Sequence, residues 1–280
     1  MRNNEPNHLD QVKSGNRFEF GKNWLKYLDD FDRNKLSNAE ESLKKMLNTE
    51  NLSGKSFLDI GSGSAIFSLA AKNLGANVVS TDFDPKCIAC AKDLKNKFYK
   101  NDDNWMILEG SAIDKNFMNS LGKFDIVYSW GVLHHTGEMW TALDYVDANV
   151  KEGGKLFISI YNDQGLMSKI WRLIKKTYVM IPRFLRFIIV IPCLIALWGP
   201  ITLRDFLILK PFSSWKSYNK DRGMAAYTDL LDWVGGYPFE VASPSSIFMF
   251  YKQKNYSLKN LITVSGGHGC NQYVFKKDKI

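Results

Sequence analysis

The sequence predicts an α/β fold, in which a doubly wound, mostly parallel sheet of seven strands carries a helical insertion after the fifth strand. Short apolar segments alternate with helical segments from residue 56 to residue 160. A glycine-rich turn, Gly61-Ser62-Gly63, directly follows the first apolar segment, and the alternation stops between residues 162 and 238. Strands that alternate with helices form βαβ units, whose parallel strands are covered on both faces.

The elements of this core are short and separated by turn residues. We expect strands over 56–60, 77–80, 105–108, 124–128 and 155–160, and helices over 65–74, 85–98 and 139–150. A helix over 245–254 and strands over 261–264 and 272–275 complete the core, and the glycine-rich segment 265–269 joins these two strands. Two strands with so short a connection form a hairpin, which makes the last strand antiparallel to its neighbours.

This pattern divides the chain into four parts. Residues 1–53 form an N-terminal helical segment, with apolar residues at Leu43, Met46 and Leu47 on one helical face and a candidate lid over 18–24. A helix that only covers the sheet is the alternative for that lid. Residues 54–161 form the α/β core, 162–242 a basic, apolar helical insertion, and 243–280 the last helix and two strands.

Composition indicates a folded intracellular protein. Of 280 residues, 45% are hydrophobic and 24% charged, which supports a buried core and excludes disorder of the whole chain. Four cysteines are too few and too scattered for a disulfide framework, and the polar segment 1–10 does not resemble a secretory signal. We therefore expect a cytoplasmic location, with the inner face of the membrane as an option.

The glycine turn has the position of a ligand-binding loop, because ligands bind at the carboxyl ends of parallel strands. Asp59 ends the first strand, and Asp82 ends the second, 21 residues after Gly61. Glycine lets the backbone approach a ligand closely, and a carboxylate at the second position accepts hydrogen bonds from ribose hydroxyls. A dinucleotide site would require a third glycine where this chain has Ile66. Asp59 would also repel a pyrophosphate, so these residues favour S-adenosylmethionine, which is cationic and carries no phosphate.

Four motifs, at 57–64, 81–85, 109–112 and 124–135, resemble in order and spacing those of the class I S-adenosylmethionine-dependent methyltransferases. More narrowly, they are similar to the small-molecule methyltransferases related to ubiquinone-biosynthesis O-methyltransferases. The resemblance covers residues 50–160. The chain departs from the family at Ala65, where glycine is common, and at Ser111, where aspartate is common.

The resemblance implies a role for each cofactor-binding residue. Asp59, Gly61, Ser62 and Gly63 would line the methionine end of S-adenosylmethionine, and Asp82 would hold its ribose. Phe83 would lie against the adenine, Ser111 and Ala112 would meet its edge, and Ser129, Trp130 and Gly131 would pass beside the sulfonium.

Two histidines are the candidate catalytic residues. His134 and His135 lie just beyond the carboxyl end of the fourth strand, and a general base near neutral pH suits transfer to a hydroxyl. Related enzymes often have histidine at the place of His135. Capping or packing is the alternative role for both. The segment 161–164 follows the fifth strand and would either contact substrate or form a turn.

No metal site is expected. Cys87 and Cys90 have the spacing of a zinc-binding pair, but no second Cys/His pair accompanies them, which favours core packing. His268 and Cys270 lie in the glycine-rich turn and are expected to be structural, with a place at the edge of the substrate pocket as the alternative.

One segment of the insertion, residues 162–222, accounts for the whole net charge. Residues 162–222 contain six Lys and five Arg against three Asp, a balance equal to the net charge of +8 for the full chain. Met167, Ile170, Trp171 and Ile174 follow helical spacing on one face. The apolar run 187–203 is short for a membrane span and contains Pro192 and Pro200, so we expect it to be broken and interfacial. A helical cap over the acceptor is the alternative.

These features together predict an S-adenosylmethionine-dependent methyltransferase that acts on a small or lipid-like acceptor at oxygen, with possible peripheral membrane contact through 165–210. An RNA methyltransferase is one alternative, but no compact RNA-binding motif is present, and nucleic acid is not the expected partner. A non-catalytic subunit that binds S-adenosylmethionine is the other alternative.

Overall fold

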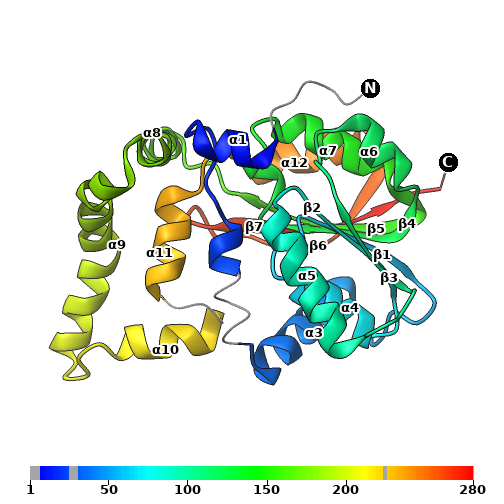
Figure 1. Ribbon diagram of the computed structural model, residues 1–280, viewed down its shortest axis with the longest axis horizontal. Helices are drawn as coiled ribbons and strands as arrows, with labels where there is room; N and C mark the ends of the chain where they lie inside the picture. Colours follow the sequence, from blue (N-terminus) through cyan, green and yellow to red (C-terminus); the bar gives the residue numbers. More distant parts are fainter. Residues whose placement is uncertain (1–6, 25–30, 223–225, 280) are drawn as a thin grey trace.

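The computed structural model describes residues 7–24, 31–222 and 226–279, and contains one seven-stranded sheet (Figure 1). The strand order is β3-β2-β1-β4-β5-β7-β6. The strands are β1 (Ser56–Ile60), β2 (Asn77–Asp82), β3 (Trp105–Glu109), β4 (Phe124–Trp130), β5 (Val150–Tyr161), β6 (Tyr256–Ile262) and β7 (Cys270–Lys277).

The pairing pattern confirms the predicted doubly wound sheet. Strands β1 to β5 pair in parallel, whereas β7 is antiparallel to both β5 and β6. The sheet order reverses direction at β1, whose neighbours are β2 and β4. Ligands bind at such a switch point, outside the carboxyl ends of the strands.

Helices cover both faces of the sheet and build the insertion. The α-helices are α1 (His8–Lys13), α3 (Arg33–Leu47), α4 (Ile66–Asn73), α5 (Pro85–Phe98), α6 (Lys115–Ser120), α7 (Met139–Ala148), α8 (Leu166–Met180), α9 (Phe187–Leu207), α10 (Ser213–Arg222), α11 (Ala226–Gly235) and α12 (Pro244–Lys252). Short 3₁₀ turns lie at Leu133–His135 and Arg183–Leu185.

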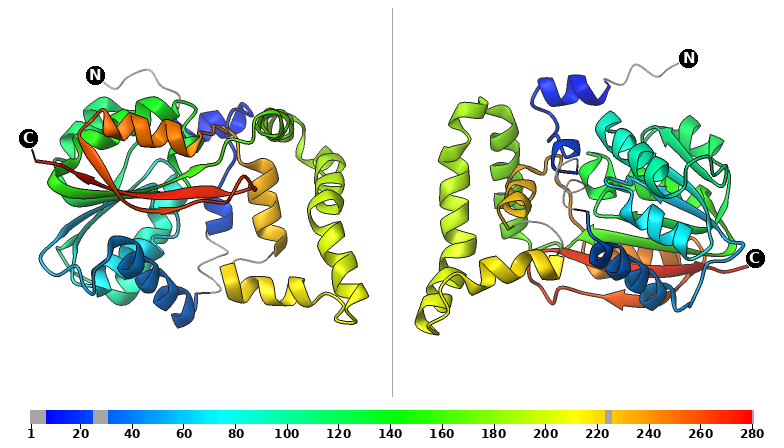
Figure 2. Two further views of the ribbon diagram at one scale, coloured as in Figure 1. Left: turned by 180° about the vertical axis from the view of Figure 1, so that it is seen from behind. Right: turned by 60° about the horizontal axis from the view of Figure 1, so that its bottom comes forward.

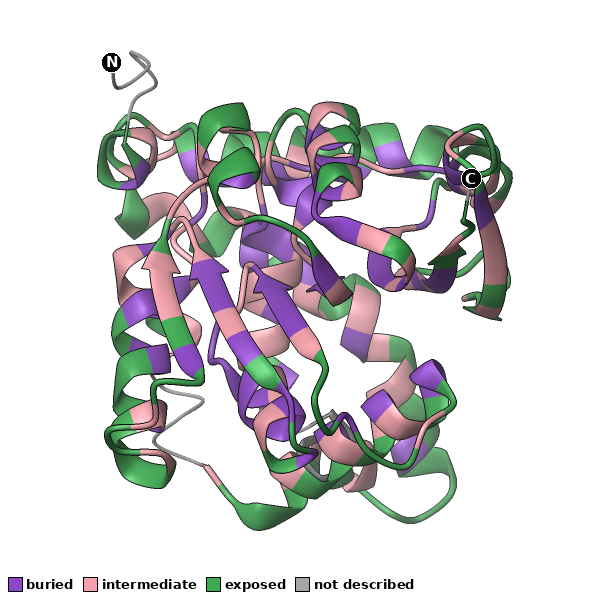
Figure 3. Cartoon of the chain, turned by 90° about the vertical axis from the view of Figure 1, so that its right-hand side faces the viewer, coloured by how far each residue is buried: buried purple, intermediate pink, exposed green. Residues whose placement is uncertain are grey.

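The side chains of each strand point alternately to the two faces of the sheet, and each face is covered by its own layer of helices. Phe57 packs with α3, α4 and α5 on one face, and Leu58 packs with α6, α7 and α12 on the other. Successive strand residues point to opposite faces, so an uninterrupted apolar run fits a sheet covered on both sides. Figure 3 shows the buried residues gathered on the strands and on the inward sides of the helices.

Several predicted boundaries were wrong. The helix expected over 139–150 ends at Ala148, because Val150 already pairs with Phe124 as the first residue of β5. The strand expected over 261–264 runs from Tyr256 to Ile262, since cross-strand pairing with β7 outweighs the polar residues at its start. The helix α6 was not predicted.

The described residues of the insertion form mainly helices, α8 to α11, and have a core of their own, to which α8, α9 and α11 contribute. The expected break in the apolar run is wrong, because α9 continues through Pro192 and Pro200 for 21 residues. Each proline removes one hydrogen-bond donor, but the apolar residues on both sides maintain the helix. Figure 2 shows α9 as an outer helix, with α11 between it and the sheet.

The predicted buried face of α8 is partly wrong. Met167 and Ile170 are exposed, whereas Trp171, Lys175 and Tyr178 are buried. A lysine at the centre of the buried face was not expected, because the long polar side chain of lysine normally reaches solvent.

Candidate functional site

The glycine loop connects β1 to α4 and is held against the end of β2. The amides of Gly61 and Ser62 both donate to the carbonyl oxygen of Thr81, at 2.8 and 2.9 Å. Gly61 and Gly63 have φ angles of 73° and 56°, in the left-handed region that glycine adopts without strain. A Cβ atom on Gly61 would lie 2.3 Å from a methyl carbon of Val132, so the loop has no room for a side chain there.

Asp82 lies at the carboxyl end of β2 and faces this loop. Its two carboxylate oxygens accept hydrogen bonds from the amide of Gly63, at 2.9 Å, and from the amide of Asp84, at 2.8 Å. Burial raises the pKa of Asp82 to about 6, against these hydrogen bonds, which lower it. Each oxygen retains lone pairs, so the carboxylate can accept further hydrogen bonds from a ligand that carries two neighbouring hydroxyls.

Asp59 lies beneath the loop. Its carboxylate is 1% exposed and accepts a hydrogen bond of 2.6 Å from the hydroxyl of Ser68 on α4. Burial raises the pKa of Asp59 to about 7. A nearby cation would stabilise the ionised form, but the predicted contact with a cofactor amino group stays a prediction.

The predicted adenine-binding residues follow the neighbouring ends of β2 and β3. Phe83 is half-buried, with the guanidinium of Arg17 at 5.4 Å from its ring centroid and the ring of His8 at 5.6 Å in edge contact. The hydroxyl of Ser111 accepts a hydrogen bond from the amide of Ile113 and therefore shapes its own turn. Ala112 is half-buried beside Ser111.

Ser129 and Trp130 have different surroundings although they are neighbours on β4. Ser129 is fully buried, and its hydroxyl donates to the carbonyl oxygen of Ile60 at 2.9 Å. This bond joins the ends of β4 and β1, so the side chain of Ser129 has a structural role. Trp130 is 43% exposed, and Gly131 follows it with a φ of 74°.

The N-terminal segment lies over these strand ends, where Figure 1 shows it in blue between the insertion and the core. The amide of Gly21 donates to the carboxylate of Asp84 at 3.0 Å, and the indole of Trp24 packs against Gly63. Arg17 donates to the carbonyl oxygens of His135 and Thr136 at 2.9 and 3.2 Å. These contacts fit both a lid and a segment that only covers the sheet, so the lid stays a prediction.

The sequence did not indicate that Arg17 belongs to the candidate site. Burial lowers the pKa of its guanidinium to about 10, although the carboxylates of Asp82 and Asp84 act in the opposite direction. No local pattern could have identified this residue, because the site groups that it contacts, the carbonyl oxygens of His135 and Thr136, lie more than 100 positions away along the chain.

His135 is buried and fixed on both sides. Its Nδ1 atom lies 2.7 Å from the carbonyl oxygen of Pro238, and the ring of Phe20 packs against it at 4.8 Å. Burial lowers the pKa of His135 to about 3, and the charges of Lys175 and Arg17 lower it further. The expectation of an ordinary histidine pKa near neutrality is therefore wrong, while base catalysis by His135 stays a prediction.

His134 is fully buried next to His135. Its Nδ1 atom accepts a hydrogen bond from the amide of Tyr161 at 3.3 Å, and its ring lies 3.9 Å from the ring of Tyr161. Burial holds the pKa of His134 well below the usual histidine value. These contacts support the packing role for His134.

Residues 162–164 support the turn-forming alternative. The side chain of Asn162 bonds to Asn271 and to the carbonyl oxygen of Gly267, and Gln164 donates to the carbonyl oxygen of Gly266. Asp163 accepts from the amide of Gly165. These bonds hold the turn after β5 against the 265–269 connection.

The two cysteines of α5 belong to the core. Cys87 and Cys90 are both buried and free, and burial raises the pKa of the Cys90 thiol to about 11. Among residues 7–24, 31–222 and 226–279, no group of three or more His, Cys, Asp or Glu side chains is arranged to hold a metal ion.

The donor and acceptor set around the loop fits S-adenosylmethionine. Asp59, Asp82 and Asp84 present three carboxylates near the strand ends, which suits a cationic ligand with ribose hydroxyls better than a diphosphate. The buried hydroxyl of Ser62 has no hydrogen-bond partner among the described residues and is available to a ligand.

Comparisons with known proteins agree with this geometry. A family model described as a methyltransferase domain matches residues 31–184. The ubiquinone biosynthesis O-methyltransferase of Glaesserella parasuis serovar 5 (strain SH0165) is 28% identical over 156 residues, which are 56% of this chain. The match spans 66% of that relative, so this chain covers just under two thirds of its length.

Solved structures share the fold. Magnesium protoporphyrin IX methyltransferase from Synechocystis PCC 6803, with bound S-adenosylhomocysteine, superposes with a TM-score of 0.51 and 13% identity over 89% of this chain and 86% of that one. A chain of the complex between the Haloferax volcanii Trm112 methyltransferase activator and a putative methyltransferase superposes with a TM-score of 0.53 and 12% identity. That match covers 95% of this chain and 98% of the other.

Proposed function

The chain belongs to the class I S-adenosylmethionine-dependent methyltransferases, and from that membership we propose that it methylates an oxygen atom of a small or lipid-like acceptor. Its cofactor is S-adenosylmethionine. Asp82 would hold the ribose, the Gly61–Gly63 loop the methionine end, and Phe83 the adenine. The observation that carries this assignment is Asp82, whose carboxylate faces the loop at the switch point of the sheet.

The bound cofactor supplies the electrophilic methyl carbon, so the protein has mainly to orient the acceptor and exclude water. Orientation alone can contribute roughly 7–11 kcal/mol to the lowering of such a barrier. The N-terminal segment contacts the strand ends through Gly21, Trp24 and Arg17, and in this position it would help to keep water from the bound cofactor. Support for an oxygen acceptor comes from the O-methyltransferase relative.

Exposed apolar residues on the insertion support a lipid-like acceptor and contact with a membrane surface. The described residues contain one helix, Arg183–Leu207, that is long and apolar enough to cross a membrane by length and composition, and only 17% of its most apolar window is buried. Ile188, Ile191 and Ile195 are exposed on one side of α9. A soluble protein rarely exposes so many neighbouring apolar residues without a binding function.

Basic residues adjoin this apolar surface. Arg183 and Arg204 are both exposed, one at each end of the apolar run, and Lys176 is exposed on α8. Cations beside an apolar surface favour contact with anionic lipid headgroups. We therefore propose that the reaction takes place at a membrane surface, with the cytoplasmic face as the expected side.

A labelling experiment tests the proposed function. The protein is incubated with methyl-labelled S-adenosylmethionine and separate lipid, small-metabolite and RNA fractions of a cell extract. We expect label in the lipid or small-metabolite fraction, together with release of S-adenosylhomocysteine. Label confined to RNA would establish the RNA methyltransferase alternative. If the protein binds S-adenosylmethionine but no fraction gains label, the result would favour the alternative of a non-catalytic subunit.

A further inference from the structure

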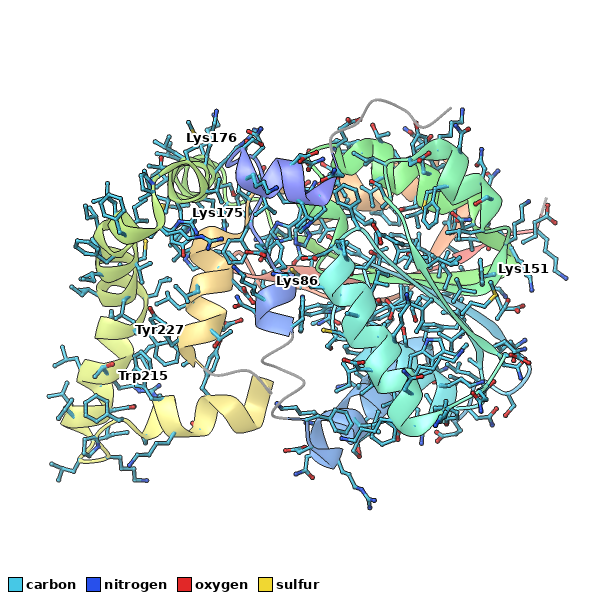
Figure 4. All side chains as sticks on the ribbon, in the orientation of Figure 1. Lys86, Lys151, Lys175, Lys176, Trp215 and Tyr227 are labelled. Atoms are coloured by element: carbon cyan, nitrogen blue, oxygen red, sulfur yellow. The ribbon has the colours of Figure 1, made fainter. Side chains whose placement is uncertain are left out.

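Lys175 is fully buried inside the insertion, where aromatic rings surround its ammonium group. Its Nζ atom lies 4.4 Å from the ring centroid of Trp233, 4.8 Å from that of Phe239 and 5.8 Å from that of Tyr161. It also donates to the carbonyl oxygen of Trp233. Figure 4 labels Lys175 between α8 and α11, and Lys176 on the outer side of α8.

This buried cation has no carboxylate partner at ion-pair distance within the described part of the chain. Asp232 acts on Lys175 electrostatically, but its carboxyl group is hydrogen-bonded to Asn23. Burial lowers the pKa of Lys175 to about 7, against the influence of Asp232, which raises it. Burial of an ammonium group without a paired anion is costly. If this position had only a packing role, an apolar side chain of the same length, such as methionine, would fill it without this cost.

Two further hydrogen-bond donors lie unused beside Lys175. The indole nitrogens of Trp171 and Trp233 are buried and have no partner among the described residues. The two rings are 5.5 Å apart, and both are in contact with the ring of His268. A buried tryptophan normally finds an acceptor for its N–H group. His268 is exposed, so the cluster adjoins solvent at the 265–269 turn.

The three groups contribute donors and no acceptors. An ammonium group and two indole N–H groups match a ligand group that only accepts hydrogen bonds, as an ionised carboxylate does. The surrounding rings match an apolar or aromatic body. We propose that Lys175, Trp171 and Trp233 form a binding site for the carboxylate of a small apolar or aromatic acid, which is the methyl acceptor.

The location links this site to the reaction, and the inference in this respect rests on the proposed function. The ring of Tyr161 lies against the rings of both His134 and His135, and the ammonium group of Lys175 lies 5.8 Å from the centroid of the same tyrosine ring. The charge of Lys175 acts on both histidines. An acid held by Lys175 therefore lies next to the strand ends at which the cofactor binds.

The test uses binding and not turnover. Benzoate and hexanoate are titrated by calorimetry into the protein saturated with S-adenosylhomocysteine, alongside the neutral analogues benzamide and hexanamide. We expect at least one acid to bind at least tenfold more tightly than its amide, and Lys175→Met to abolish this preference. Lys169→Met, at another exposed position of α8, is the matched control and should behave as the wild type does.

Equal binding of acid and amide by the wild type would overturn the proposal, and this comparison needs no variant. Unchanged acid affinity in Lys175→Met would overturn it as well. Retention of S-adenosylhomocysteine affinity shows that Lys175→Met is folded, and Lys175→Arg should retain part of the preference. Failure of the proposed function would be visible in different measurements: the wild type would not bind S-adenosylhomocysteine, or it would give no labelled product in the labelling experiment.

Discussion

The Nδ1 atom of His135 lies 2.7 Å from the carbonyl oxygen of Pro238 and joins the loop after β4 to the end of the insertion, 103 residues later. A carbonyl oxygen only accepts, so Nδ1 carries the hydrogen and Nε2 keeps its lone pair in the neutral ring. The bond therefore selects the tautomer in which Nε2 is able to receive a proton.

We expect His135→Gln to lower turnover about 10²-fold if His135 is a general base. The affinity for S-adenosylhomocysteine, measured by calorimetry, should stay unchanged, because the glutamine occupies a similar volume. Since burial lowers the pKa of His135 to about 3, its neutral form prevails across the physiological range. Unchanged turnover in this variant would exclude His135 as the base.

Asp82→Asn should weaken the binding of S-adenosylhomocysteine more than tenfold, because a hydrogen bond to a charged group contributes roughly 1.5–3 kcal/mol. The substitution also places an amide where the carboxylate accepts from Gly63 and Asp84. Asp103→Asn, at an exposed turn, is the matched control and should leave the affinity unchanged. Equal affinity of both variants and the wild type would refute the ribose assignment.

The affinity of the wild type should also depend on pH. Burial raises the pKa of Asp82 to about 6, so the carboxyl group gains a proton as the pH falls through that value. A protonated carboxyl group accepts hydrogen bonds from ribose less well, and the affinity for S-adenosylhomocysteine should therefore decline below about pH 6. Titration calorimetry from pH 5 to pH 8 should show this decline in the wild type and a smaller one in Asp82→Asn, in which Asp59, whose pKa burial raises to about 7, still titrates.

Gly61→Ala should destabilise the fold more than Gly122→Ala. Both glycines have positive φ angles, 73° and 77°, so both substitutions incur a backbone penalty of roughly 1–2 kcal/mol. Only at Gly61 would the new Cβ meet another side chain, that of Val132. The free energy of unfolding in urea measures the difference, and equal losses in the two variants would show that Val132 moves aside freely.

Simultaneous substitution of Ile188, Ile191 and Ile195 by glutamine should abolish flotation of the protein with anionic liposomes. The control replaces Met106 and Met249, which are exposed to a similar extent outside the insertion, and should float as the wild type does. Raised salt should weaken flotation of the wild type, because the adjoining cations contribute electrostatically. Flotation of the triple variant with the lipids would contradict the proposed surface.

Local sequence patterns identified the five parallel strands and most of the helices between them, although they missed α6. The helix predicted over 85–98 is the observed α5, because Asp84 accepts from the amide of Lys86 at its first turn and Pro85 suits that turn. The continuation of α9 through its two prolines could not be predicted. A proline indicates a break, and only the whole helix decides whether the remaining hydrogen bonds outweigh the loss.

Sequence patterns alone predicted the parallel core and the cofactor, because strand periodicity, the glycine loop and Asp82 are features of neighbouring residues. Tertiary structure alone decided the surroundings of the candidate acceptor site. It brought Arg17 to the carbonyl oxygen of His135, Pro238 to the His135 ring, and Lys175 into a cage of rings from α11 and the following segment. Contacts between segments so far apart along the chain leave no local pattern, and burial, which moves the pKa values of His135 and Lys175, exists only once those segments have packed.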